Sequence, residues 1–351
     1  MICHLCGNDK LSKEFPEEHL TEDCIKHALL HCLRCVTTAV QDHQKCSQCK
    51  VQVTKDNEKY KQFVQILELL FPTVATGDEF DANSEPIDAT SDESHSQIVV
   101  ATLSGDSTTL PYDPDQSILS FKEIVEQELE TPCPKQSLWY NEIELKESGP
   151  NNEVLTLKDY HVQPNSRIYL LVLLYAIPDR FNQVIFNLLW EYPESGRDYL
   201  DASVLLYSGT NFVDVIDFSN RESKSCPGVQ HSGDVVDDDE QSGHHTIHVS
   251  IKSIPSHINK LIFTLSSWHS SNISKYPSLS LRFFDAEFPD KQLCDDKMSH
   301  AAYSQAIIMC CLINRGGGWK VFSLKRPSAG NVLNYRQIKS TSMALIEKGY
   351  I

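Results

Sequence analysis

The spacing of apolar and polar residues changes several times along the chain, and each change marks a different kind of structure. Residues 60–71 carry apolar side chains at helical spacing and stop at Pro72, which predicts one amphipathic helix. Residues 73–96 are acidic, have no apolar period and contain neither Lys nor Arg. Such a composition buries too little surface to order itself, so we expect a flexible linker there.

The next segment, residues 97–174, alternates short apolar runs with one helical run. Residues 97–105 and 108–110 predict a hairpin, and residues 121–129 have helical periodicity that ends before Pro132. Residues 137–140 then predict a strand, and residues 168–174 a final buried strand. This order predicts a small α+β domain.

From residue 180 onward the pattern is that of strands alone. The strand-like runs are residues 183–190, 202–207, 246–251, 261–266, 279–284, 307–313 and 319–324. Glycine, proline, serine or acidic clusters separate them, and Gly316–Gly318 joins the last two as a hairpin. Strands without long helices between them predict an antiparallel β-sandwich.

The first fifty residues are instead dominated by cysteine. They follow the pattern C-x2-C-x17-C-x2-H-x4-C-x2-C-x10-C-x2-C, formed by Cys3, Cys6, Cys24, His27, Cys32, Cys35, Cys46 and Cys49. Eight soft ligands make two tetrahedral sites, and four such ligands are what structural zinc takes. A disulfide framework is the alternative. The chain begins without a signal-like apolar stretch, so we expect a cytoplasmic protein, the nucleus being the other option, where thiols stay reduced.

This ligand order resembles the RING finger, a family that recruits ubiquitin-conjugating enzymes. The resemblance implies that Cys3, Cys6, Cys32 and Cys35 share one zinc ion, and that Cys24, His27, Cys46 and Cys49 share the other. Leu5 resembles the apolar residue that many RING fingers present to the conjugating enzyme. His31 is an alternative ligand to His27, because both would share a helix face with Cys24. A finger that binds zinc without ligase activity also stays open.

Residues 97–174 resemble ubiquitin in the Thr102–Gly105 hairpin, the Leu157–Tyr160 turn and the apolar last strand. The resemblance implies a β-grasp domain that is not itself conjugated, because the last strand continues into Leu174 and beyond without a di-glycine tail. The positions that match ubiquitin's receptor-binding patch are Leu103, Trp139 and Leu171, with Tyr169 beside them. Either the patch is exposed and binds a ubiquitin receptor, or Trp139 is buried against the neighbouring domain.

Several stretches after residue 180 resemble the TerD family of bacterial stress-response proteins. They are Leu188–Trp190, Tyr199–Ser203, Val229–Asp234 and Gly318–Phe322. The resemblance implies a β-sandwich with acidic loops that bind calcium, an ion that takes six to eight oxygen ligands. Asp201 and Asp234 keep two of the acidic positions, so we expect a degenerate calcium site. Gly243–His245 stands where the family often has acidic residues, and His244, His245 and His248 are an alternative transition-metal set.

Composition excludes two classes of partner. The 351 residues carry a formal charge of −17, which argues against a nucleic-acid surface. No apolar run is long enough to cross a bilayer, so we expect no membrane partner. We predict four segments: a RING-like finger with its helix (1–72), the linker (73–96), a ubiquitin-like domain (97–175) and a TerD-like domain (180–351).

These features support three hypotheses. The first is a RING-type ubiquitin ligase, or a ligase component, linked to stress response, whose TerD-like domain recruits substrate or ligand. Its chemistry would be borrowed from a conjugating enzyme, since no side chain of its own would attack. The second is a non-catalytic zinc-binding adaptor in stress signalling, and the third is a calcium-responsive sensor.

Overall fold

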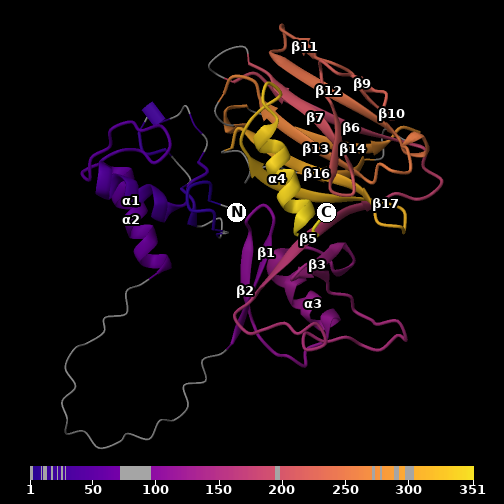
Figure 1. Cartoon of the computed structure of the whole chain (residues 1–351), viewed down its shortest axis with the longest axis horizontal. Coiled ribbons are helices and arrows are strands. Elements are labelled where there is room, and N and C mark those ends of the chain that lie inside the picture. The colour runs from indigo at the N-terminus through magenta and orange to yellow at the C-terminus, as the bar shows by residue number, and fades with distance from the viewer. Residues whose placement is uncertain are drawn as a thin grey trace, which may run out of the picture.

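The structure is a computed structural model of the whole chain (Figure 1). It describes residues 3–8, 10, 14–16, 19–21, 23–24, 27, 29–71, 96–193, 198–270, 273–276, 279–287, 292–296 and 304–351. The expected linker, residues 73–96, lies outside the described residues except for residue 96. Among the described residues, none of the helices has both the length and the hydrophobicity needed to span a bilayer.

The N-terminal finger contains two helices, α1 (Leu33–His43) and α2 (Glu58–Leu70). The side chain of Asn57 accepts a hydrogen bond from the Tyr60 amide and so caps the start of α2. The helix predicted over 60–71 is therefore confirmed, with an earlier start, whereas α1 was not predicted. Val40 and Phe63 are buried in one small cluster between the helices. The described part of the finger thus has a small apolar core, and metal binding at its cysteine pairs would add to its stability.

The ubiquitin-like part has the β-grasp arrangement, in which a helix covers a mixed sheet. Its elements are β1 (Gln97–Thr102), β2 (Ser107–Pro111), α3 (Ile118–Leu129), β3 (Gln136–Tyr140), β4 (Ile143–Glu144) and β5 (Arg167–Ala176). Strand β1 pairs antiparallel with β2 and parallel with β5, and β3 pairs antiparallel with β5. Ser117 caps α3 through its hydroxyl oxygen. Phe121 and Val125 of α3 are fully buried against the sheet.

The C-terminal part is built from strands, as predicted, and from one helix that was not predicted. The strands are β6 (Gln183–Glu191), β7 (Leu200–Ser208), β8 (Asn211–Ile216), β9 (Glu222–Ser223), β10 (Cys226–His231), β11 (Val235–Asp237), β12 (Ser242–Ser250), β13 (Lys260–Ser267), β14 (Ser280–Asp285), β15 (Gln292–Asp296), β16 (Ala306–Asn314) and β17 (Trp319–Ser328). Helix α4 (Arg336–Glu347) follows them. Each of the seven predicted runs lies in one strand, with at most one residue beyond its ends. The sequence pattern did not predict the shorter strands β8 to β11 and β15.

Two facing sheets contain all of the described strands. One runs β2-β1-β5-β17-β16-β13-β7-β8, with β3 and β4 attached at β5, and the other runs β15-β14-β6-β12-β10-β9, with β11 attached at β12. Between the sheets, the rings of Phe186 on β6 and Phe263 on β13 stack with their centroids 3.8 Å apart. The apolar side chains that face inward from both sheets form one core. The C-terminal part is therefore the predicted β-sandwich.

Strand β5 belongs to both the ubiquitin-like part and the sandwich. Its first half pairs with β1, where Val100 lies opposite Ile168, and its second half pairs with β17, where Phe322 lies opposite Leu173. Figure 1 shows β5 running from the ubiquitin-like part to the sandwich. The two parts therefore share a continuous sheet, and the expected boundary near residue 175 falls at the end of a strand that both need.

Candidate metal centres and the buried ubiquitin-like patch

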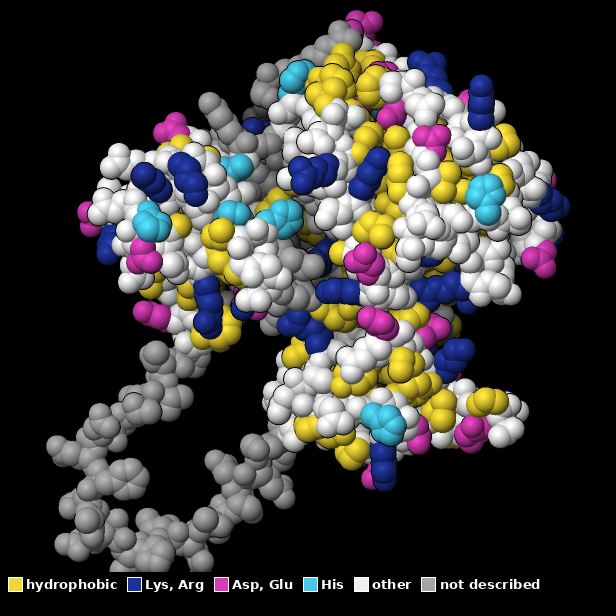
Figure 2. All heavy atoms as spheres, in the orientation of Figure 1, with side chains coloured by type: hydrophobic (Ala, Val, Ile, Leu, Met, Phe, Trp, Pro, Cys, Tyr) yellow, Lys and Arg dark blue, Asp and Glu magenta, His cyan; other side chains and the backbone are white. Residues whose placement is uncertain are grey.

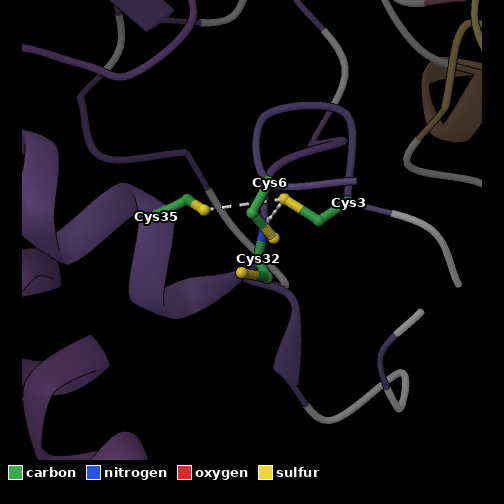
Figure 3. Close-up of side chains that lie close together, drawn as sticks. All are labelled: Cys3, Cys6, Cys32 and Cys35. Carbon is green, nitrogen blue, oxygen red and sulfur yellow. Dashed lines mark hydrogen bonds between the residues drawn. The ribbon is translucent and has the colours of Figure 1, made fainter. Parts of the chain in front are cut away.

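The first candidate metal centre gathers the side chains of Cys3, Cys6, Cys32 and Cys35, whose sulfur atoms lie within 4.8 Å of one another. Figure 3 shows the four thiols directed to one point, two of them from the first turn of the chain and two from the start of α1. The second centre gathers Cys24, His27, Cys46 and Cys49 within the same limit. The pairing of the eight residues in these two clusters is the alternating order that the RING resemblance implied.

Distances between the ligand atoms fit a tetrahedral zinc ion. With Zn–S bonds of about 2.3 Å, two sulfur ligands of a tetrahedron lie roughly 3.8 Å apart. The Cys3 and Cys35 sulfurs are 3.7 Å apart, and those of Cys24 and Cys49 are 3.6 Å apart. In the second centre, His27 Nε2 lies 3.3 Å from the Cys46 sulfur. Both clusters could therefore hold a metal ion such as zinc.

The thiols of the first centre differ in how readily they ionise. Burial raises the pKa of Cys3, but backbone N–H groups of Cys6, Cys32 and Leu5 outweigh it and lower the pKa to about 7. Burial raises the pKa of Cys35 far above its usual range, and the neighbouring Cys32 thiol adds to the effect. Metal binding must therefore displace protons from buried thiols that would otherwise stay neutral.

The choice between His27 and His31 is decided by what each imidazole contacts. His27 points its Nε2 atom into the second centre, while His31 Nδ1 lies 2.9 Å from the hydroxyl of Ser47. His31 belongs to neither ligand cluster among the described residues. Burial lowers the pKa of His31 to about 4, so its imidazole is neutral. The geometry therefore places His27, and not His31, among the candidate ligands of the second centre, and His31 bonds Ser47 beside it.

Leu5 lies between the first two ligands and is exposed. Its side chain is 54% accessible, although Cys3 is fully buried. Single exposed apolar side chains are common on protein surfaces, so the exposure of Leu5 makes it accessible to a partner protein without identifying one.

Of the other four predicted contact residues, three are buried and Tyr169 is half-buried. Leu103, Trp139 and Leu171 are 3%, 7% and 1% exposed, and they pack in one apolar cluster with residues of β16, β17 and α4. The guanidinium of Arg315 lies 4.6 Å from the centroid of the Trp139 ring, and Tyr169 packs on Tyr350 at 4.9 Å. Of the two alternatives, an exposed patch or a Trp139 buried against the neighbouring domain, the structure has the second. The patch is not available to a ubiquitin receptor.

Asp201 and Asp234, the two expected calcium ligands, flank a buried histidine. His245 Nδ1 accepts a hydrogen bond from the Ala202 amide, so its Nε2 carries the proton and donates to Asp234 Oδ1 at 2.9 Å. Asp201 is 3% exposed, and its Oδ2 has no hydrogen-bond partner in the described part of the chain. Burial and the carboxylate of Asp234 raise the pKa of Asp201 to about 8.

The neighbouring carboxylates of Asp198 and Asp217 already accept hydrogen bonds from other side chains. Asp198 accepts hydrogen bonds from Ser270, and Asp217 accepts them from the Ser219 hydroxyl and from the Tyr335 hydroxyl. Among the described residues, no set of three acidic or histidine ligand atoms comes within 4.8 Å here. A neutral imidazole lies where an ion would need oxygen ligands, so the residues do not fit calcium.

The alternative histidine set is split by the alternation of β12. His245 is 1% exposed and faces the core, whereas His244 and His248 occupy the opposite face of the strand and are half-buried. A second buried imidazole belongs to His231, and its ring centroid lies 4.7 Å from that of His245. The sequence analysis did not predict this residue as part of the site. Only the inward alternation of His245 with Ile247 could have shown that this position is in the core.

Comparisons with known proteins agree with this division of the chain. The model of the ubiquitin family matches residues 98–174, and the model of the TerD domain matches residues 172–334. The two matches overlap at residues 172–174, inside the shared strand β5.

Relatives were found for the C-terminal part. Tellurium resistance protein TerZ of Serratia marcescens is 25% identical, over 40% of this chain and 72% of its own length. Stress response protein SCP2 of Bacillus subtilis is 26% identical, over 34% of this chain and 63% of its own length. A crystal structure of a TerD homologue from Streptomyces coelicolor aligns with 45% of this chain and 96% of its own, at 13% identity and a TM-score of 0.39. The chain thus contains a ubiquitin-family domain followed by a TerD domain, behind a finger with two candidate metal centres.

Proposed function

We propose that the chain is a RING-type ubiquitin ligase, or a component of one, in a stress response. Its finger would hold two zinc ions and recruit a charged ubiquitin-conjugating enzyme through the surface around Leu5. The finger would supply no nucleophile, because a RING finger accelerates transfer by positioning the conjugating enzyme. The TerD domain would then recruit the substrate or ligand.

The observation that carries this proposal is the alternating pairing of the eight ligands. Each centre joins a pair from the first half of the finger to a pair from the second half. This arrangement fixes the Leu5 turn and the start of α1 to the same ion, so an exposed apolar side chain is held on a rigid support.

The relatives support the stress-response part of the proposal. They are named for tellurium resistance and for stress response, and they match the C-terminal half of the chain. Because the similarity lies between 25% and 26%, it gives a class of process and not a substrate.

The test is autoubiquitylation of the zinc-loaded full chain with a panel of conjugating enzymes. We expect ubiquitin chains with the wild type and none with Cys32→Ser, which removes a ligand of the first centre. Leu5→Ala should lose activity while keeping both zinc ions, since Leu5 is exposed and ligates nothing. Full activity in Cys32→Ser would overturn the ligase proposal.

A non-catalytic adaptor is the second candidate, and the buried patch favours it. The ubiquitin-like domain shares β5 with the TerD domain and uses Trp139 and Leu171 for packing, so it serves here as a structural unit. A chain in which one ubiquitin-pathway module is structural can use its finger in the same way. A folded, zinc-replete protein that forms no chains with any conjugating enzyme would make the adaptor the leading interpretation.

A further inference from the structure

A cavity of about 360 Å³ lies where the finger, the ubiquitin-like domain and the TerD domain meet, and we call it the junction cavity. The finger contributes Leu30 and its first turn, which includes Cys3 of the first candidate metal centre. The ubiquitin-like domain contributes Leu103 and Tyr169, and the end of β17, one face of α4 and the residues that follow α4 supply the rest. Small-ligand sites are commonly concave spaces of roughly 300–1,000 Å³ at such domain interfaces.

The cavity departs from the packing found elsewhere at the same interface. Leu30 and Ala329 are both buried where the finger meets the TerD domain, so the two surfaces close together there. Around α4 they leave a space of about 360 Å³ instead. The exposed residues Gln337 and Ser340 are part of the lining, so the space is open to solvent and a ligand can enter it.

The charge of the lining is opposite to that of the chain. Arg326 and Lys348 line the cavity, and no Asp or Glu is among its lining residues. The whole chain carries 48 acidic and 31 basic residues, so a random sample of its surface would contain more carboxylates than cations. Figure 2, which shows one face of the molecule, has several Lys and Arg side chains along the line where the three parts meet, with some Asp and Glu side chains among them. A cationic lining with no carboxylate favours an anion.

The remaining lining is mainly apolar or aromatic. Leu103 and Leu345 are buried, and Ala344 lies beside Leu345 on α4. The rings of Tyr169 and Tyr350 lie 4.9 Å apart and both line the cavity. An apolar body would contact these side chains, and an anionic group would lie toward the two cations.

We propose that the junction cavity binds a small organic anion, a carboxylate, sulfate ester or phosphate ester with an apolar body. Because the finger forms one wall and α4 another, such a ligand contacts both parts at once. Binding therefore favours the arrangement in which the finger lies against the TerD domain, by the free energy of the contacts that only this arrangement provides. The inference stands independently of whether the finger has ligase activity.

The experiment compares two fluorescent probes of nearly the same shape on the zinc-loaded full chain. One is 8-anilinonaphthalene-1-sulfonate, an anion, and the other is the uncharged N-phenyl-1-naphthylamine. We expect the anion to bind roughly tenfold more tightly than the neutral probe. Lys348→Gln should weaken the binding of the anion by roughly fivefold and leave the affinity for the neutral probe unchanged. Ala344→Phe, which fills the space, should remove the binding of both probes.

Arg336→Gln is the matched control. It removes the same charge from the same helix, but Arg336 is exposed and does not line the cavity, so both affinities should stay as in the wild type. Equal affinity for the two probes overturns the proposal, as does the same anion affinity in Lys348→Gln and Arg336→Gln. Unchanged binding in Ala344→Phe overturns it too. If Ala344→Phe does not fold, the comparison of Lys348→Gln with Arg336→Gln decides the matter.

Discussion

Shortening Leu171 to alanine tests whether the ubiquitin-like patch is part of the core. Leu171 is 1% exposed on β5 and packs in the cluster that includes Trp139, Phe322 and Leu345. Removing a buried leucine side chain typically costs 2–5 kcal/mol, so we expect a loss of about 3 kcal/mol of unfolding free energy. For a folding unit of this size, that loss lowers the melting temperature by about 6–12 °C.

The assay is urea and thermal unfolding followed by tryptophan fluorescence, with Leu119→Ala as the control. Leu119 lies on α3 of the same domain and is 46% exposed, so its truncation should change stability by no more than about 0.5 kcal/mol. Because β5 belongs to both domains, Leu171→Ala should lower the stability of both in one transition. A change in Leu171→Ala as small as in the control would mean that the patch is exposed and that the domains do not share a core.

Three further predictions concern the metal centres and the acidic site. His27→Ala should reduce the zinc released by a chelator from two ions to one per chain, whereas His31→Ala should keep two, since only His27 belongs to a ligand cluster. Equal zinc content in the two variants would refute the assignment. Burial and nearby Asp234 raise the pKa of Asp201 from 3.8 to about 8, so the folded state holds a proton there that the unfolded state has lost. The stability that this bound proton contributes is therefore present at pH 4 and is lost as the pH rises to 8. In the presence of a calcium chelator, the melting temperature of Asp201→Asn should rise relative to that of the wild type between pH 5 and pH 8.5. A difference in melting temperature between Asp201→Asn and the wild type that stays constant from pH 5 to pH 8.5 would contradict the raised pKa of Asp201. Millimolar calcium should leave the melting temperature of the wild type unchanged, whereas His245→Glu, which places a carboxylate beside Asp234, should melt higher with calcium than with chelator. A calcium-dependent rise in the wild type would show that the site binds the ion after all.

The elements that the sequence predicted best are those with a strong local pattern. The resemblance of the ligand order to a RING finger implied the pairing of all eight ligands, and the two clusters in the structure have that pairing. The alternation of β6 predicted that strand, because its buried and half-buried residues alternate, whereas β7 and β13 were marked by short apolar runs that are buried on both faces. Helix α4 lacked such a signal, because its buried residues Ile338, Ser342 and Leu345 include a serine and its neighbours on both faces are polar.

What the sequence could not show is how the parts contact each other. The patch at Trp139 and Leu171 has the same local pattern whether it is exposed or covered, and only the pairing of β5 with β17 decides between the two. The same holds for the acidic site. Asp201 and Asp234 are both present in the sequence, but the imidazole of His245, which bonds Asp234 and the Ala202 amide beside Asp201, comes from β12, in the sheet opposite to Asp201. Long-range contacts of this kind leave no trace in a single sequence.

The most direct test of the proposed function is discharge of ubiquitin from a charged conjugating enzyme to free lysine, in a single turnover, with and without the zinc-loaded chain. The assay needs no substrate, so it isolates the contribution of the finger. We expect the intact chain to accelerate discharge by at least one enzyme of a panel, and Leu5→Ala to lose most of that acceleration with its zinc content unchanged. Discharge at the same rate with and without the folded, zinc-loaded chain, for every enzyme of the panel, would contradict a ligase function for the finger.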